Sequence, residues 1–222
     1  MSKPFISYLV SCKDEGNQLL LLLQQLQKYK NNNECIILND FTKDSNTLKI
    51  LDDIKNDEFF KVYTHALDNN YSAHKNYGKS FCSGEYIFQL DADELPCDTL
   101  MENITAILET NPSIDLFWVP RINDFIGVNE THAMKWGWRL SNYENRKIVN
   151  FPDFQGRLFK NLPELRWERP LHEKIEGAKI TTKLPPEYDL SIHHNKTIEK
   201  QVATNLRYNK DFSEELNKGF KV

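Results

Sequence analysis

Short apolar runs alternate with longer amphipathic segments through the first half of the chain. Each run has the length and β-favouring composition of a buried strand, and each segment is long enough for a helix. The alternation predicts an α/β fold with a mostly parallel central sheet flanked by helices. The predicted strands are 5–12, 34–39, 59–64 and 85–90, and the predicted helices are 13–30, 40–54, 70–84 and 95–110.

The pattern changes after about residue 113, where apolar runs are separated by polar loops that contain proline and glycine. No long helical pattern returns until residues 197–216. We therefore predict a strand-rich C-terminal half with a closing C-terminal helix, joined with the first half into a single domain, 1–222. The predicted strands of this half are 113–122, 154–161, 165–175 and 186–194.

Composition and charge narrow the class of protein. The chain has 28 basic and 32 acidic residues, a net charge of −4, which gives no electrostatic case for binding nucleic acid. No apolar stretch approaches the ~20 residues of a membrane helix, and the N-terminus lacks the features of a signal peptide. The four cysteines are widely spaced and form no CxxC pair, as is typical of reduced thiols. These features predict a cytoplasmic protein without an integral membrane segment.

An acidic cluster directly follows the fourth predicted strand, in the stretch "FQLDADELP". Asp91 and Asp93 point to the same side if the strand continues, because side chains alternate along a strand. Two close carboxylates repel each other unless a proton or a cation lies between them, and Mg²⁺ or Mn²⁺ suits oxygen ligands. The alternative is that these acids, with Glu94, cap the helix that follows.

Three segments in order along residues 5–100 resemble family 2 glycosyltransferases with the GT-A fold. "ISYLVSCKDEGNQLLLLLQQL" resembles the opening strand, acidic turn and first helix of the family. "ECIILNDFTKDSNT" resembles its second strand and the acidic loop that follows. "YSAHKNYGKSFCSGEYIFQLDADE" resembles the segment that leads to the DxD strand. The resemblance implies a nucleotide-binding half, 1–100, and an acceptor and catalytic half, 113–222.

The resemblance also implies roles for single residues. Those expected near the nucleotide are Cys12, Asp14, Glu15, Asp40, Lys75, Asn76, Asp91 and Ala92. Asp93 is expected to bind the divalent metal that bridges the diphosphate, and Asp91 to face the ribose or the same metal. Asn39, Phe41 and Lys75 depart from the residues that the family often has at their positions, which leaves the preferred nucleotide open.

A base is needed to take the proton from the acceptor hydroxyl, and two acids of the second half are candidates. Glu173 follows a predicted strand in "RWERPLHEKIEG", which resembles a segment of one branch of the family. Asp153 lies in "NFPDFQGRLFK", where a turn is an ordinary alternative. Glu173 is favoured. Arg157 nearby is expected to reach a phosphate or to pair with a carboxylate.

The segment "SIHHNKT" offers a histidine ligand, because imidazole suits Mn²⁺ and the chain can return here to the acidic edge. His193 and His194 point in opposite directions along a strand, so one of them is the expected ligand. His194 is preferred because "HNK" resembles a pattern in related sequences. Lys196 is then expected to neutralise diphosphate charge.

The resemblance implies a metal-dependent inverting glycosyltransferase that uses Mn²⁺ or Mg²⁺ and a nucleotide-sugar, with a UDP-sugar as the donor class. The acceptor is expected to be a hydroxyl of a glycan, a lipid-linked sugar or a protein. A metal-dependent nucleotidyltransferase is one alternative, although the turn "SCKDEGNQ" is acidic where that class needs a glycine-rich basic loop. A non-catalytic module that binds nucleotide-sugars is the other.

Overall fold

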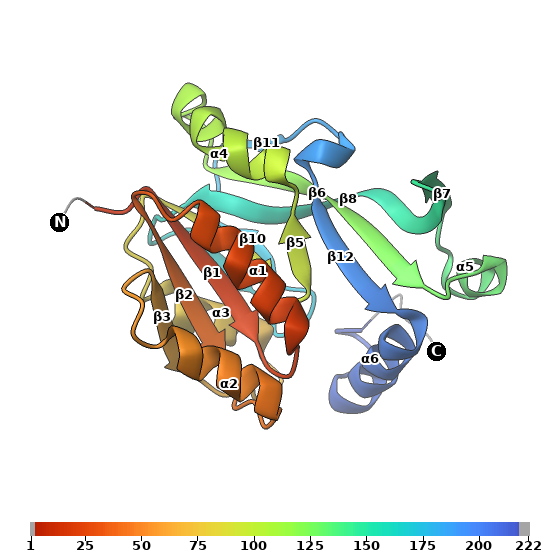
Figure 1. The fold of residues 1–222 in the computed structure, drawn as a ribbon. Coiled ribbons are helices and arrows are strands. Elements are labelled where there is room, and N and C mark those ends of the chain that lie inside the picture. The colour runs from red at the N-terminus through yellow and green to blue at the C-terminus, as the bar shows by residue number, and fades with distance from the viewer. Residues whose placement is uncertain (1–2, 218–222) are drawn as a thin grey trace.

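The computed structural model describes residues 3–217. One ten-stranded mixed sheet runs through both halves of the chain in the order β3-β2-β1-β4-β8-β6-β12-β5, with β11 paired to β6 and β7 to β8 (Figure 1). A separate antiparallel pair, β9-β10, lies outside this sheet. The predicted α/β fold with a strand-rich second half and a C-terminal helix is confirmed.

The first half follows the predicted strand–helix alternation. Strands β1, β2, β3 and β4 pair in parallel, so their carboxyl ends meet at one edge of the sheet. The strands are β1 (Ile6–Cys12), β2 (Asn33–Asn39), β3 (Phe60–Thr64) and β4 (Tyr86–Asp91). The helices are α1 (Asn17–Lys28), α2 (Ser45–Ile54), α3 (Tyr71–Lys79) and α4 (Asp98–Thr110).

The second half extends the sheet mainly through two long strands, β6 and β8, which run antiparallel to each other. Its strands are β5 (Glu94–Pro96), β6 (Leu116–Ile126), β7 (Leu140–Tyr143), β8 (Arg146–Lys160), β9 (Arg166–Glu168), β10 (Lys174–Glu176), β11 (Thr181–Lys183) and β12 (Ile192–Thr197). Its helices are α5 (Glu130–Trp136), the short 3₁₀ helix η1 (Tyr188–Leu190) and α6 (Ile198–Asp211). Helix α6 is the last helix of the described residues, and it lies beside the end of β12 (Figure 1).

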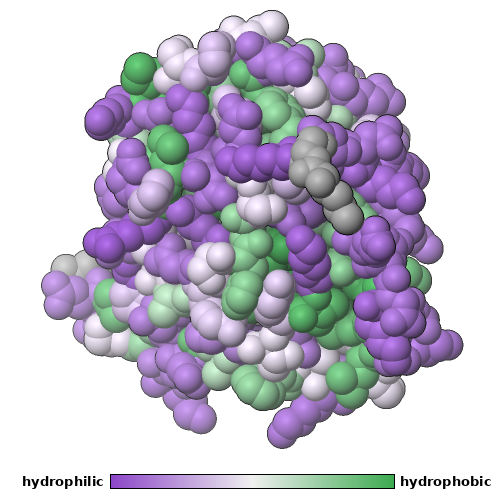
Figure 2. Space-filling view, turned by 90° about the vertical axis from the view of Figure 1, so that its left-hand side faces the viewer, coloured by the Kyte–Doolittle hydropathy of each residue, from purple (hydrophilic) through white to green (hydrophobic). Residues whose placement is uncertain are grey.

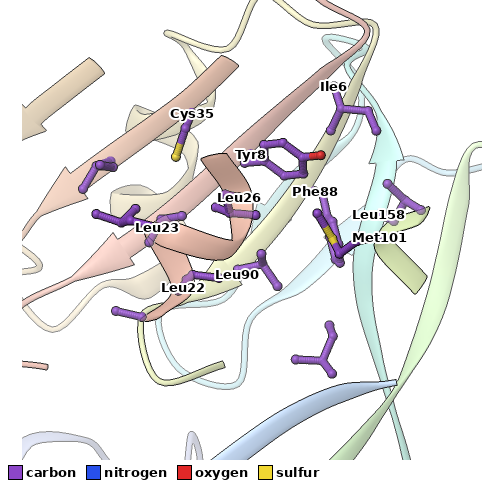
Figure 3. Packing of buried hydrophobic residues seen from close by; sticks show 14 of the residues in the cluster. Ile6, Tyr8, Leu22, Leu23, Leu26, Cys35, Phe88, Leu90, Met101 and Leu158 are labelled. Carbon is purple, nitrogen blue, oxygen red and sulfur yellow. The ribbon is translucent and has the colours of Figure 1, made fainter. Parts of the chain in front are cut away.

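The larger hydrophobic core lies between the sheet and helices α1, α2 and α4. Leu22, Leu23 and Leu26 of α1 pack near Tyr8 and Phe88 of the sheet (Figure 3). Full burial of one such leucine stabilises the fold by about 1.5–3 kcal/mol. A smaller cluster on the opposite face includes residues of β9 and β10, so both faces of the sheet are covered.

Several local predictions differ from the structure, among them the predicted strand 186–194, where the 3₁₀ helix η1 precedes β12. Residues 94–96 form strand β5, which pairs antiparallel with β12, and α4 begins only at Asp98. The stretch 165–175 is two short strands, because the positive φ angles of Arg169 (77°) and His172 (52°), with Pro170 between them, interrupt extended backbone. Helix α5 was not predicted because it has a single buried residue, Ala133.

Among the described residues, no helix combines the length and apolar composition needed to cross a membrane. The left-hand side of the molecule, seen in Figure 2, is mostly hydrophilic, with its hydrophobic residues in separate patches. Helices α1, α2 and α4 bury apolar residues in the core against the sheet.

Candidate functional site

A cleft of about 700 Å³ opens where β1, β2 and β4 end and is closed on the other side by residues of β6, β8, β12 and α6. It gathers most of the site residues predicted from the sequence. Those that line it are Cys12, Glu15, Asp40, Lys75, Asp91, Ala92, Asp93, Asp153, Arg157, Glu173, His194 and Lys196. Asp14 and Asn76 are not among the lining residues in the described part of the chain.

Two of the three acids in the "DADE" stretch are neutralised by a buried arginine. Arg157 of β8 donates to Asp91 Oδ2 at 2.7 Å and to Glu94 Oε1 at 2.5 Å. It also donates to Gln89 Oε1. Burial alone would raise the pKa of Asp91, but the charges of Arg157 and Lys75 hold it far below its usual value. Asp91 is therefore an anion whose charge is already compensated within the protein.

Glu94 connects this arginine to a second one. Its side chain is 1% exposed, and Oε1 also accepts a bond from Arg121 at 2.9 Å. Arg121 donates in turn to Asp153 Oδ2 through Nε at 3.0 Å and Nη2 at 2.7 Å. A chain of alternating charges thus runs from Asp91 to Asp153 beneath the cleft.

The capping interpretation of these acids is wrong. The N-cap of α4 is Cys97, whose side chain makes no capping bond in the described structure. Glu94 instead bonds both arginines and accepts from the backbone N–H of Asp91 at 3.1 Å. Since β5 intervenes between the acids and the helix, the acids lie too far ahead of α4 to cap it.

Asp93 has a different environment, because it faces a histidine. His194 Nε2 lies 3.6 Å from Asp93 Oδ2, and its Nδ1 lies 2.9 Å from Asn123 Oδ1. The Asn123 amide nitrogen donates to Asp153 at 2.9 Å, which leaves its oxygen to accept from Nδ1–H of His194. Nε2 is therefore the ring nitrogen that faces Asp93 Oδ2, and either the proton of a charged imidazole or a cation between the two atoms would satisfy both groups.

The pKa values in this corner reflect burial and neighbouring charges. Burial would raise the pKa of Asp93, but the hydrogen bond and charge of His194 hold it below its usual value. Burial raises the pKa of Glu15, and the charge of Asp93 adds to the effect. Burial lowers the pKa of Lys196 to about 8, although the charge of Asp93 opposes the shift.

Lys75 is 4% exposed and forms an ion pair with Glu173, the favoured candidate for the base. Its Nζ lies 2.6 Å from Glu173 Oε1, 3.3 Å from Gln89 Oε1 and 3.5 Å from Asp91 Oδ1. The backbone at His172, next to Glu173, is strained because its φ angle is positive (52°). The position of Glu173 is therefore set by the surrounding fold. Lys75 therefore joins the base candidate to the acidic strand end.

Asn76, the neighbour of Lys75, is engaged elsewhere. Its amide donates to Trp167 O at 2.8 Å and accepts from Trp167 N–H at 3.0 Å. This pair of bonds fixes β9 against α3.

Polar groups at the ends of β1 and β2 form the other end of the cleft. Asp40 pairs with Lys13 at 2.8 Å and accepts from the backbone N–H of Leu67 at 2.9 Å. Asp14 accepts from Thr42 Oγ1 at 2.7 Å, which lowers its pKa and orders the turn before α2. Burial raises the pKa of the Cys12 thiol to about 12, so this lining group is neutral at physiological pH.

Sequence reasoning missed the pairing of Arg121 with Glu94 and Asp153, and the residues of α6 that face the cleft. One signal was available, since an arginine inside the apolar run "LFWVPRI" needs a partner when buried. The acidic partners lie 27 and 32 positions away, which no local pattern reveals.

The family model for glycosyl transferase family 2 matches residues 7–162. This is more than half of the chain, and the chain therefore belongs to glycosyl transferase family 2. The prediction of this family, and with it of a glycosyltransferase, is confirmed. No curated protein matches the chain in sequence.

Solved structures show the same fold. S. aureus TarS 1-349 in complex with UDP-GlcNAc has a TM-score of 0.61 at 14% identity, over 86% of this chain and 58% of that one. S. aureus TarS 1-349 in complex with UDP has a TM-score of 0.60 at 14% identity, over 95% of this chain and 68% of that one. The chain thus spans about six tenths of these TarS chains, and at this identity the likeness concerns the fold.

Proposed function

We propose that this chain transfers a sugar from a nucleotide-sugar, with a UDP-sugar as the donor class, to a hydroxyl of a glycan, lipid-linked or protein acceptor. The observation that carries the proposal is the selective arrangement of charge in the cleft. Asp91, Glu94, Asp153 and Glu173 each have a cation within 2.7 Å, whereas among residues 3–217 the ion-pair contacts of Asp93 are longer, 3.6 Å to His194 Nε2 and 3.9 Å to Lys200 Nζ. Family membership and the UDP and UDP-GlcNAc complexes of TarS support the donor class.

Asp93 and His194 would hold the divalent metal. Among residues 3–217, no cluster of three or more histidine, cysteine or acidic side chains is arranged as a metal site. Two protein ligands are nevertheless enough for Mg²⁺ or Mn²⁺, because these ions usually complete their coordination with water and substrate phosphates. Asp91 is already paired with Arg157 and Lys75. It would therefore contact the ribose or lie at the edge of the metal site. When bound, the ion would stabilise the charge that develops on the diphosphate leaving group.

Glu173 is the better candidate for the base. Asp153 Oδ2 accepts from Arg121 and Asn123, Oδ1 accepts from Gln155 at 2.8 Å, and these bonds keep the Asp153 pKa low although burial opposes them. The Oε1 atom of Glu173 accepts from Lys75, and Oε2 has no hydrogen bond from the described residues. A carboxylate with a free oxygen at the cleft can take the acceptor proton, whereas a saturated one is a weak base.

The nucleotide would bind at the β1 and β2 end of the cleft, against Cys12, Glu15, Asp40 and Ala92. Lys196 would face the diphosphate. The resemblance implies inversion at the sugar carbon, and inversion requires the base to lie on the side of the sugar opposite the leaving group.

We further propose that both halves of the chain act as one unit, because one sheet joins them. The four free cysteines are consistent with a reducing, cytoplasmic compartment, which we also propose.

The test is release of nucleoside diphosphate from UDP-, GDP- and dTDP-sugars, measured with Mn²⁺ and again with EDTA. We expect slow release from a UDP-sugar with Mn²⁺, because water can replace the acceptor, and loss of release with EDTA. Tight donor binding without release would favour a non-catalytic module. Release of pyrophosphate from a nucleoside triphosphate would favour a nucleotidyltransferase.

A further inference from the structure

Helix α6 has an unusual inward face. Its cleft-lining residues recur at positions i, i+1, i+4, i+5, i+7 and i+8, which is one side of a helix. On an ordinary surface helix this side is apolar. Here it consists of Lys200, Gln201, Thr204, Asn205, Arg207 and Tyr208.

One side-chain amide of this face is buried, and its NH₂ group has no acceptor among the described residues. Asn205 is 1% exposed, and its Oδ1 accepts from Gln201 Nε2 at 2.8 Å. Within residues 3–217, its Nδ2 has no hydrogen-bond partner. An unpaired buried donor costs about 1–3 kcal/mol, so a ligand with acceptor oxygens would satisfy a group that the protein leaves unmet.

The two cations of the face also lack a close anionic partner among the described residues. Lys200 Nζ lies 3.9 Å from Asp93, and Arg207 Nη2 donates to the neutral hydroxyl of Tyr71 at 3.1 Å. Asp40 and Glu173 of the cleft are paired with cations from other elements, Lys13 and Lys75, while the charge of Lys200 also opposes the burial that raises the pKa of Glu15. Positive charge on α6 therefore remains available to an anion.

The position of the face indicates which anion. Lys200 Nζ lies 3.9 Å from Asp93 Oδ2, and α6 lies on the side of the molecule where β1 and β2 end (Figure 1). Lys200 and Asn205 line the same cleft, and a group with several acceptor oxygens has the chemistry to accept from both. A diphosphate provides such oxygens, whereas a neutral sugar does not provide the charge.

We infer that the inward face of α6 is a diphosphate-binding surface, in which Lys200, Asn205 and Arg207 hold the phosphates of a nucleoside diphosphate beside Asp93. This assignment rests on the proposed function and adds residues that the "DADE" strand does not supply. Because α6 contributes few buried side chains, Ile198 and Asn205 in the described structure, the bound phosphates would also fix the helix over the cleft.

The test is calorimetric titration of UDP, GDP and uridine into the wild-type chain and into Lys200→Gln, Arg207→Gln and their double variant, with Mn²⁺ and with EDTA. Each single change should weaken UDP binding about 10- to 100-fold, the range expected for the loss of one hydrogen bond to a charged group. Uridine binding should not change. Lys210→Gln, on the same helix but outside the cleft lining, is the matched control and should bind UDP like the wild type.

Hydrogen exchange of the α6 amides gives a second readout. UDP should slow exchange across α6 in the wild type and in Lys210→Gln, and should not in the double variant. Equal UDP affinity in the wild type and the double variant would overturn this assignment and leave the proposed function standing. Failure of the wild type to bind either UDP or GDP would overturn both.

Discussion

Two clusters of hydrogen bonds around buried carboxylates, one around Glu34 and one around Asp91 and Glu94, lie at opposite ends of the parallel strands. At the amino end, Glu34 of β2 accepts from Ser7, from both N–H and Oγ of Ser83, and from Lys61. At the carboxyl end, Asp91 and Glu94 accept from Arg157, and Glu94 from Arg121. Both clusters are well hydrogen-bonded, but only the second borders a cleft that also holds Asp93 and the cations of α6.

The difference separates a structural carboxylate from a functional one. Glu34 is 3% exposed, and its four bonds tie β2 to β1 and to the turn before β4. The other cluster shares its cleft with Asp93 and His194 Nε2, which lie 3.6 Å apart, and with Asn205 Nδ2, which has no hydrogen-bond partner among the described residues. The proposed site is distinguished by polar groups with incomplete hydrogen bonding next to acids that are fully paired. Burial of charge alone does not distinguish it.

The largest effect on activity should come from Glu173→Gln. The amide cannot accept the hydroxyl proton, so we expect turnover to fall by about 10²–10⁴-fold while donor binding stays near the wild-type value. Steady-state kinetics together with donor titration would separate the two. Glu168→Gln, a change of the same type on exposed β9, should leave turnover unchanged, and normal turnover in Glu173→Gln would transfer the base role to Asp153 or another residue.

The largest effect on stability should come from Arg157→Met. Without Arg157, Asp91 keeps Lys75 at 3.5 Å and Glu94 keeps Arg121 at 2.9 Å, but each buried acid loses its shortest ion pair, and breaking a buried pair in this way costs about 3–5 kcal/mol. The free energy of unfolding in urea would measure this loss. Arg166→Met, which breaks an exposed pair with Glu168, should change it by less than about 1 kcal/mol, and similar losses in both variants would contradict the importance of the buried network.

A smaller effect is expected from Glu34→Gln. Burial would raise the pKa of Glu34, but its bonds to Lys61, Ser7 and Ser83 outweigh burial and lower it. A carboxyl with a depressed folded-state pKa contributes stability above its unfolded pKa and loses it as the pH falls through the folded value.

We therefore expect Glu34→Gln to cost about 1–3 kcal/mol at pH 7, and this difference from the wild type to shrink below about pH 4. Unfolding curves at several pH values would check it. Turnover of the folded variant should match the wild type, and a loss of turnover would contradict the separation of the two clusters.

The sequence predicted the elements of the first half well, because apolar runs and helical periodicity are local properties. It also predicted that Asp91, Asp93 and His194 would meet, since the ends of parallel strands share one edge and the chain returns there after residue 190. The β5 strand could not be foreseen, because three residues with a proline pair with β12 only in the folded chain.

The charge network was hidden for a similar reason. Arg157 lies 66 positions from Asp91, and Glu173 lies 98 positions from Lys75, so no spacing rule connects them. Asn76 was expected at the nucleotide, yet its amide is engaged with the backbone of Trp167. The polar inward face of α6 was visible as a pattern, but only the fold shows that this side faces a cleft rather than solvent.

The most direct measurement is titration of a UDP-sugar into the wild-type chain and into Asp93→Ala, each with Mn²⁺ and with EDTA. The account predicts binding by the wild type that weakens strongly with EDTA, and binding by Asp93→Ala that is weak and insensitive to the metal. Unchanged Mn²⁺-dependent binding in Asp93→Ala would contradict the claim that Asp93 and His194 hold a metal against the diphosphate.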